Sequence, residues 1–248
     1  PHQQLQALHV AGTNGKGSVC ATLEAVLRAK GFRVAKYTSP HLIDFRERFI
    51  IDGVPVQPER IVAFVDKWTP EVERLGATFF EATTAMAFEF FAEARVDVAI
   101  IETGLGGRLD ATNVITPLVA GVSTISIDHI EYLGGTRELI AVEKAGIFKA
   151  GVPAVIGDPD VVIRSLLAQH AAAHGATPIR VVYEQGAPAD VKVHPDGTTF
   201  TLPDHRTFTT PLVPAPHHPS TYIAFESDHS VAADAGPART NHHQPRPS

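Results

Sequence analysis

The stretch LHVAGTNGKGS, residues 8–18, decides the fold and directs the search for chemistry. A short apolar run leads into a glycine-rich turn, and the turn delivers a lysine and a serine to the start of a helical pattern. Glycines let backbone N–H groups converge on an anion, and the following helix presents its positive dipole end. The stretch therefore predicts a phosphate-binding loop. Its residues are Gly12, Thr13, Asn14, Gly15, Lys16, Gly17 and Ser18.

Two side chains of this loop carry the expected chemistry. Lys16 is expected to place its ammonium group against the outer phosphates, and Ser18 to offer its hydroxyl to magnesium. The sequence of this loop departs from the strict P-loop motif, because Val10 stands where the first glycine of the motif would be and Gly17 separates the lysine from the serine. A plain glycine turn is the alternative interpretation. The joint presence of lysine, glycines and hydroxyl between a strand and a helix argues against it.

Around this loop, apolar runs alternate with helical patterns. Strands are expected at 5–11, 32–37, 96–102, 118–127 and 152–156, and helices at 21–30, 58–75, 80–94, 137–148 and 161–174. A hairpin is expected at 49–56, around Asp52-Gly53, and short strands between 191 and 209. Near-continuous apolar strands alternating with helices predict an α/β fold, with a mainly parallel P-loop-type sheet covered by helices on both faces.

Composition excludes several classes of function. The net charge of the 248 residues is −6, which argues against a nucleic-acid-binding surface. One cysteine rules out a disulfide framework, makes a cysteine-based zinc site improbable and fits a reducing cytoplasm. We find no apolar run of membrane-spanning length, so no membrane association is expected.

A second motif, IIETGLGGRLDATN, occupies residues 100–113. Glu102 stands at the end of an apolar strand, where open α/β sheets bind their ligands, and a carboxylate there suits a magnesium ion that bridges phosphates. Asp110 follows the glycine turn and is expected to face the substrate or the lysine of the phosphate loop. A solvated acid at a strand end is the alternative for Glu102.

Two further positions are ambiguous from the residues alone. His129, in Ser126-Ile127-Asp128-His129, follows another apolar strand and is either a metal ligand or a structural histidine. Lys144 lies in a helical pattern beside an acid, and a solvated helix face is the simplest interpretation of it.

Together these segments resemble the Mur ligase superfamily and, within it, the folylpolyglutamate and dihydrofolate synthases. AGTNGKGS (11–18) looks like their first signature and ETGLGGRLDATN (102–113) like their second. YTSPHL (37–42), followed by Glu47-Arg48, resembles their folate-proximal loop. Asp128-His129 and EKAGI (143–147) match the remaining central pattern.

The resemblance implies the Mur ligase central-domain fold and an ATP-dependent ligation in folate biosynthesis. ATP phosphorylates the carboxylate of dihydropteroate or tetrahydrofolate, and the amine of L-glutamate then displaces phosphate to form an amide. Positioning and charge neutralisation accomplish this without a protein nucleophile. The resemblance further implies a cytoplasmic monomer that binds two Mg²⁺ ions. It also implies that CO₂ converts the Lys144 amine to a carbamate.

The resemblance also assigns roles to single residues. Catalytic roles fall to Lys16, His129 and Lys144. The metal ligands are Ser18, Glu102, His129 and Lys144. The folate-binding residues are Ser39, His41, Thr78, Phe80 and Asp110.

The end of the chain departs from the family's pattern. The family continues into a second α/β domain, whereas here a stretch rich in proline and histidine follows Val213. Such sequence cannot bury enough apolar area to offset its ordering entropy. We expect 1–213 to form the ATP-binding domain and 214–248 to be disordered or the product of a frameshift, with the C-terminal ligase domain absent.

Two alternatives stay open. An inactive or non-catalytic ATP-binding remnant fits the missing domain, because the family's site lies between its two domains. Another Mur-type amino-acid ligase is the second alternative, against which the SPHL loop (39–42) and the GLGGRLDATN string (104–113) argue.

Overall fold

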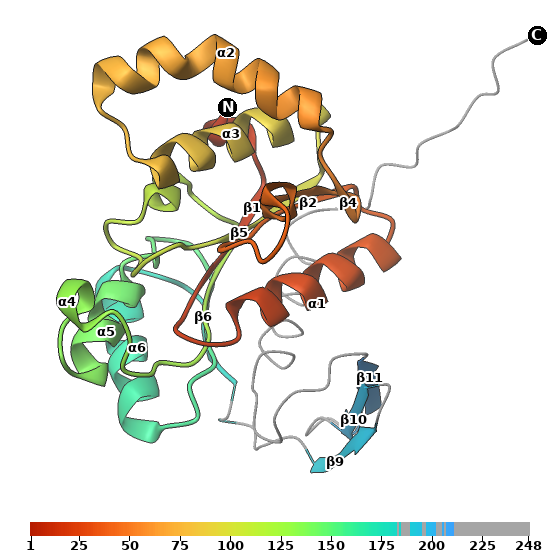
Figure 1. Ribbon diagram of the computed structural model, residues 1–248. Helices are drawn as coiled ribbons and strands as arrows, with labels where there is room; N and C mark the ends of the chain where they lie inside the picture. Colours follow the sequence, from red (N-terminus) through yellow and green to blue (C-terminus); the bar gives the residue numbers. More distant parts are fainter. Residues whose placement is uncertain (183, 185–188, 195–196, 202–204, 206, 211–248) are drawn as a thin grey trace, which may run out of the picture.

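The computed structural model describes residues 1–182, 184, 189–194, 197–201, 205 and 207–210. The predicted tail, 214–248, lies outside them. An eight-stranded sheet in the order β4-β3-β2-β5-β1-β6-β7-β8 forms the centre of the molecule (Figure 1). Strands β2, β5, β1, β6, β7 and β8 run parallel, and the hairpin β3–β4 is antiparallel at one edge, so the predicted mainly parallel sheet is confirmed.

The strands of this sheet are β1 (Ala7–Ala11), β2 (Val34–Tyr37), β3 (Phe49–Ile51), β4 (Val54–Pro55), β5 (Val98–Glu102), β6 (Val119–Val122), β7 (Ala154–Ile156) and β8 (Ile179–Val181). The helices are α1 (Lys16–Ala29), α2 (Pro58–Leu75), α3 (Phe79–Ala94), α4 (Ile130–Leu133), α5 (Arg137–Ala145) and α6 (Val161–Ala173). Short 3-10 helices are η1 (His2–Gln4), η2 (Phe45–Arg48) and η3 (Ala111–Val114). A separate antiparallel sheet contains β9 (Ala189–His194), β10 (Gly197–Thr201) and β11 (Thr207–Thr210).

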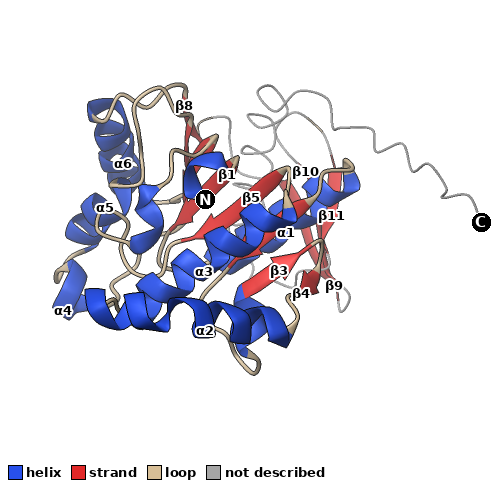
Figure 2. Cartoon of the chain, turned by 90° about the horizontal axis from the view of Figure 1, so that it is seen from above, coloured by secondary structure: helices blue, strands red, loops and turns tan. Residues whose placement is uncertain are grey.

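Alternate residues of the buried strands face two different layers. Leu8 of β1 packs in a cluster with Leu23 of α1 and Phe200 of β10, so α1 and the small sheet cover one face. Ala7 packs with the α2–α3 cluster and Ala11 with the α5–α6 cluster, so these helices cover the other. Figure 1 shows α1 below and α2 and α3 above strands β2 and β5, and Figure 2 shows β8 beside α6 at one end of the sheet. Helices on both faces are thus confirmed.

Local sequence signals account for most element boundaries. The helix over 58–75 has the predicted bounds, from Pro58 at its start to Gly76 at its C-cap with φ 62°. The predicted hairpin forms with Asp52 and Gly53 at φ 52° and 77°, as a tight two-residue turn requires. Helix α1 begins at Lys16, five residues before the predicted start at 21, because the phosphate loop leads directly into it. Strand β8 and helix α4 were not predicted from the sequence.

Within the part of the chain that the structure describes, none of the helices combines the length and apolar character that a membrane crossing requires.

Candidate active site

A cleft of about 510 Å³ opens at the carboxyl ends of β1, β2 and β5. This edge is where open α/β sheets bind ligands. The phosphate loop and the segment that follows β2 both line the cleft. The lining residues are 13–17, Lys36, Thr38, Ser39, Pro40, Leu42, Glu47, Ile50 and Glu102.

The phosphate loop is fixed against the segment that follows β6. Gly12 has φ +147°, and a Cβ there would lie 1.8 Å from Ser123 Oγ, so no larger residue fits. Ser123 Oγ donates to the carbonyl of Asn14 at 2.7 Å, and the N–H of Thr13 donates to the carbonyl of Thr124 at 2.7 Å. These bonds set the loop conformation before any anion arrives.

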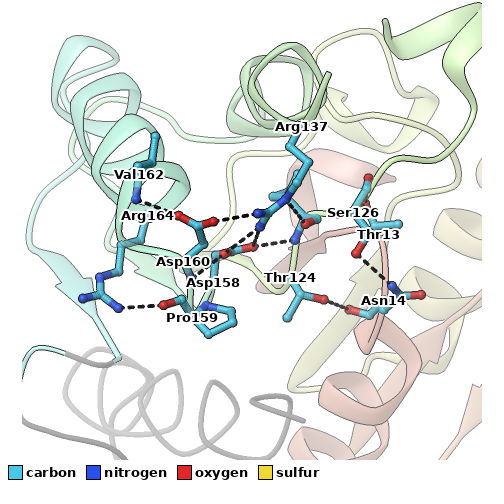
Figure 3. A network of polar contacts seen from close by, with 11 residues as sticks. Thr13, Asn14, Thr124, Ser126, Arg137, Asp158, Pro159, Asp160, Val162 and Arg164 are labelled. Carbon is cyan, nitrogen blue, oxygen red and sulfur yellow. Dashed lines mark hydrogen bonds and ion pairs between the residues drawn. The ribbon is translucent and has the colours of Figure 1, made fainter. Parts of the chain in front are cut away.

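Figure 3 shows how this anchoring continues toward α5 and α6. Thr13 Oγ1 donates to the carbonyl of Ser126 and accepts from its N–H, each at 3.1 Å. Arg137 donates from Nε to the carbonyl of Ile125 at 2.9 Å, and its guanidinium pairs with the fully buried Asp158 at 3.2 Å. Sequence reasoning missed Arg137 and Asp158, because no motif spans the residues that form this network.

Two residues predicted from separate motifs meet in the cleft. Lys16 Nζ lies 3.7 Å from Glu102 Oε1 and donates to the carbonyl of Thr13 at 3.4 Å. The Glu102 side chain is 5% exposed. Burial raises its pKa to about 7, against the opposing charge of Lys16 and a hydrogen bond from the N–H of Ser39. Because Glu102 is buried, the solvated-acid interpretation of it is wrong.

Asp110 shapes the glycine-rich loop of the second motif. One carboxylate oxygen accepts from the N–H groups of Gly104 (2.9 Å) and Leu105 (2.8 Å). The other accepts from the N–H of Thr112 at 3.0 Å and from its hydroxyl. Thr112 Oγ1 in turn lies 2.8 Å from His9 Nε2, on the buried strand β1. Asp110 therefore ties the loop after β5 to the strand that carries the phosphate loop.

The second motif also interlocks with the helix that carries Lys144. A Cβ on Gly107 would lie 2.8 Å from the carbonyl of Lys144, and one on Gly146 would lie 2.5 Å from Arg108 Cα. The N–H of Arg108 donates to the carbonyl of Glu143 at 2.8 Å. This contact also explains why helix α5 ends at Ala145, three residues before the predicted end at 148.

Lys144 is 4% exposed, so the interpretation of it as a residue on a solvated helix face is wrong. Burial lowers its pKa to about 8, and the charge of Lys16 lowers it further, while Asp128 and Asp110 oppose the shift. A lysine amine with such a pKa has a substantial neutral, nucleophilic fraction near pH 8.

The predicted metal ligands come from different segments of the chain: Ser18 from α1, Glu102 from the end of β5, His129 from the residue before α4, and Lys144 from α5. Glu102 lines the cleft, whereas Ser18, Lys144 and His129 are not among the residues that line it. His129 is the N-cap residue of α4, with φ 50°, and its side chain is about half exposed, with Nε2 3.5 Å from Asp128 Oδ2. Among the described residues, no group of three or more His, Cys, Asp or Glu side chains is placed to hold a metal ion.

Hydrogen bonds between the loop's own residues and the adjoining Glu47 and Arg48 hold the predicted folate loop in place. Glu47 accepts from the N–H groups of Leu42, Ile43 and Asp44 at 2.7–3.0 Å. Arg48 Nε donates to His41 Nδ1 at 2.9 Å. The Ser39–Pro40 peptide is cis, and Ser39 and Leu42 line the cleft.

The remaining two folate candidates lie at the start of α3. Thr78 is the N-cap of this helix and forms a capping box with Glu81. Phe80 rests on the backbone of Gly104, where a Cβ would lie 2.4 Å from its ring, and its centroid is 6.1 Å from that of Tyr37. Phe80 thus contacts the same loop that Asp110 shapes.

Comparisons with known proteins identify relatives of this chain. The family model of the Mur ligase middle domain matches residues 10–216. A dihydrofolate synthase/folylpolyglutamate synthase of Bacillus subtilis is 45% identical over 183 residues, which are 69% of this chain and 43% of that protein. A folylpolyglutamate synthase of Arabidopsis thaliana is 44% identical over 173 residues, 66% of this chain and 30% of the relative.

Solved structures of related proteins have the same fold as this chain. An FPGS–AMPPCP–folate complex superposes with a TM-score of 0.86 at 36% identity, over 94% of this chain and 59% of that one. The complex of E. coli FolC with DHPP and ADP gives 0.76 at 35% identity, over 93% of this chain and 54% of that one. The chain thus spans less than two thirds of these relatives. Because the family model covers most of its residues, the chain belongs to the Mur ligase family and contains the family's middle domain.

Proposed function

We propose that this chain is the ATP-binding part of a ligase that joins L-glutamate to dihydropteroate, to tetrahydrofolate or to both. One observation carries the proposal: Lys16 and Glu102 meet in a cleft that Ser39 and Leu42, of the loop resembling the folate loop, also line. The names of the relatives point to the same reaction. We place this reaction in the cytoplasm, carried out by a monomer.

In the proposed reaction, an oxygen of the acceptor carboxylate attacks the γ-phosphorus of ATP, and ADP leaves with the electrons of the broken P–O bond. The amine of glutamate then attacks the acyl phosphate, loses a proton and expels phosphate to leave an amide. Lys16 and the N–H groups of the loop neutralise and hold the transferred phosphoryl group. These residues bind and orient the reactants, and the proposed reaction needs no covalent attack on substrate by a protein side chain.

The chemistry of the donor set supports one Mg²⁺ site. Glu102 offers a buried carboxylate, and the serine hydroxyl of Ser18 lies in the first turn of α1. Such hard oxygen donors suit Mg²⁺, which would neutralise phosphate charge when bound. For a second ion, the proposed ligands are His129 and Lys144.

Lys144 is proposed to act as a carbamate. Its buried amine, with a pKa of about 8, is suited to attack CO₂ and lose a proton. The product is an anion in place of a cation beside Lys16, and an anion can help to hold a metal ion. Ser39, His41, Thr78, Phe80 and Asp110 remain the proposed acceptor-side residues. For Asp110 the hydrogen bonds to Gly104 and Leu105 support an indirect role, through loop shape.

The test is product mass. The chain is incubated with Mg-ATP, bicarbonate and L-glutamate, and with dihydropteroate or tetrahydrofolate in turn. A pteroyl species extended by one glutamate, absent with Lys16→Met, supports the ligase and identifies the acceptor. No product with either acceptor, under conditions in which ATP binds, contradicts ligation by this chain.

The same experiment tests an inactive ATP-binding remnant. ATP binding that depends on Lys16, without product, is the result it predicts.

A further inference from the structure

A second lysine, Lys36, lines the cleft from an unexpected position. It is the third residue of β2, between Ala35 and Tyr37, which are both fully buried. Inner strands of a parallel sheet covered on both faces are normally apolar throughout. The Lys36 side chain is 16% exposed, so its stem is largely covered while the residue still faces the cleft.

The Lys36 ammonium contacts one carboxylate oxygen of Glu24, on the buried side of α1. The Glu24 side chain is 9% exposed, and its other oxygen, Oε1, is buried without a hydrogen-bond partner among the described residues. A buried ion pair gains little net stability, because desolvation of both charges offsets their attraction. With one oxygen left unpaired, stability alone is a poor explanation for this pair.

The two lysines approach the cleft in a similar way. Lys16 comes from the first residue of α1 and Lys36 from β2, and each is held by a largely buried carboxylate, Glu102 and Glu24 respectively. The charges of Lys16 and Lys36 both act on Glu102, so both ammonium groups lie within electrostatic range of it. A polyphosphate presents charged oxygens along several bonds, so two cations from different elements that line one cleft can contact it at once.

We propose that Lys36 is a second phosphate-binding residue of this cleft, with the outer phosphates of a nucleoside triphosphate as its ligand. Glu24 is its positioning residue: it holds the ammonium at the cleft wall and competes with phosphate for it. The inference rests on the proposed nucleotide site and adds a contact outside the glycine-rich loop.

Calorimetric titration of Mg-ATP, and separately of inorganic tripolyphosphate, tests this assignment on the full chain. Lys36→Met is expected to weaken the binding of both ligands by about tenfold or more, which is the usual effect of losing a charge-assisted hydrogen bond. Lys36→Arg should restore much of the affinity. Glu24→Gln should bind both ligands at least as tightly as the unmodified chain, because the competing carboxylate is gone. Lys67→Met, on α2 outside the cleft, controls for the loss of one positive charge.

A purely structural Lys36–Glu24 pair predicts a different pattern. Both single variants would then lose thermal stability and keep their affinity for tripolyphosphate, and that result overturns the proposal. Should Lys36→Met fold poorly, Lys36→Met/Glu24→Gln removes both charges and should regain stability while still binding weakly. Lys16→Met distinguishes a failure of the Lys36 assignment from a failure of the proposed nucleotide site. If it abolishes ATP binding while loss of Lys36 has no effect, only the second-lysine assignment fails; if the chain binds neither ligand, both fail.

Discussion

At the scale of single residues, Glu102 couples stability to pH. Its pKa is about 7 in the folded chain, against a usual value near 4.5. A raised carboxyl pKa means that the folded state holds more protons, so this contribution to stability is present below about pH 4.5 and is lost as pH rises through 7. Glu102→Gln should therefore be more stable than the parent at pH 8, by about 1–3 kcal/mol, and converge with it near pH 5.

Thermal unfolding between pH 5 and pH 8.5 checks this prediction. Glu47→Gln is the matched control, because hydrogen bonds from the backbone of Leu42 and Asp44 lower the pKa of Glu47. The stabilisation of the folded state by ionised Glu47 is therefore present above the ordinary carboxyl pKa and is lost on acidification. The control should thus be less stable than the parent at pH 8, opposite in sign to Glu102→Gln. Equal shifts for both variants would contradict the account.

Lys144 gives a second residue-scale prediction. Carbamate formation needs the neutral amine, so with a pKa of about 8 the modified fraction should rise between pH 6 and pH 8.5 at constant CO₂. Carbon-13 NMR of the chain in labelled bicarbonate measures it, and Lys144→Arg should remove the signal. A carbamate signal that survives in Lys144→Arg belongs to another amine, and no signal at pH 8.5 argues against the modification.

At the scale of elements, the phosphate loop offers a matched pair of glycines. Gly12→Ala forces a Cβ to within 1.8 Å of Ser123 Oγ at φ +147°, so it should cost about 2 kcal/mol or more and loosen the loop. A Cβ on Gly17 would meet no atom within 4 Å, and Gly17 lies in helix α1, so Gly17→Ala should leave stability unchanged or slightly higher. Chemical denaturation compares them. Similar losses for both would show that loop flexibility, rather than the contact with Ser123, requires glycine.

The sequence predicted elements well where one local rule decides them. The turn at Asp52-Gly53 and the helix stop at Gly31, with φ +89°, follow from backbone chemistry that neighbours do not alter. The burial of Lys144 depends instead on the loop of Gly107 packing on its helix, a contact between residues far apart in the chain. The same limit applies to Lys36, which in the sequence is only a polar residue within a short apolar run.

At the scale of the whole molecule, the charged network behind the phosphate loop connects β6 to α5 and α6. Asp158 is fully buried and accepts from the N–H groups of Ile125 (2.7 Å) and Asp160 (2.9 Å) as well as from Arg137. Arg137 also pairs with Asp160 at 2.7 Å. The network thus holds the segment after β6, on which the phosphate loop rests, to the start of α6.

Arg137→Met should therefore affect both stability and binding. It leaves the buried Asp158 carboxylate without its cation, which typically costs about 3–5 kcal/mol. Asp158→Asn alone should also destabilise, and the double variant should lose less than the sum of the two, with a coupling of about 1–3 kcal/mol by denaturation. Because Arg137 also holds the carbonyl of Ile125, next to the Ser126 that anchors Thr13, ATP affinity should fall in Arg137→Met even where the chain is fully folded. Unchanged affinity in that variant would mean that the network supports the fold but leaves the phosphate loop independent of it.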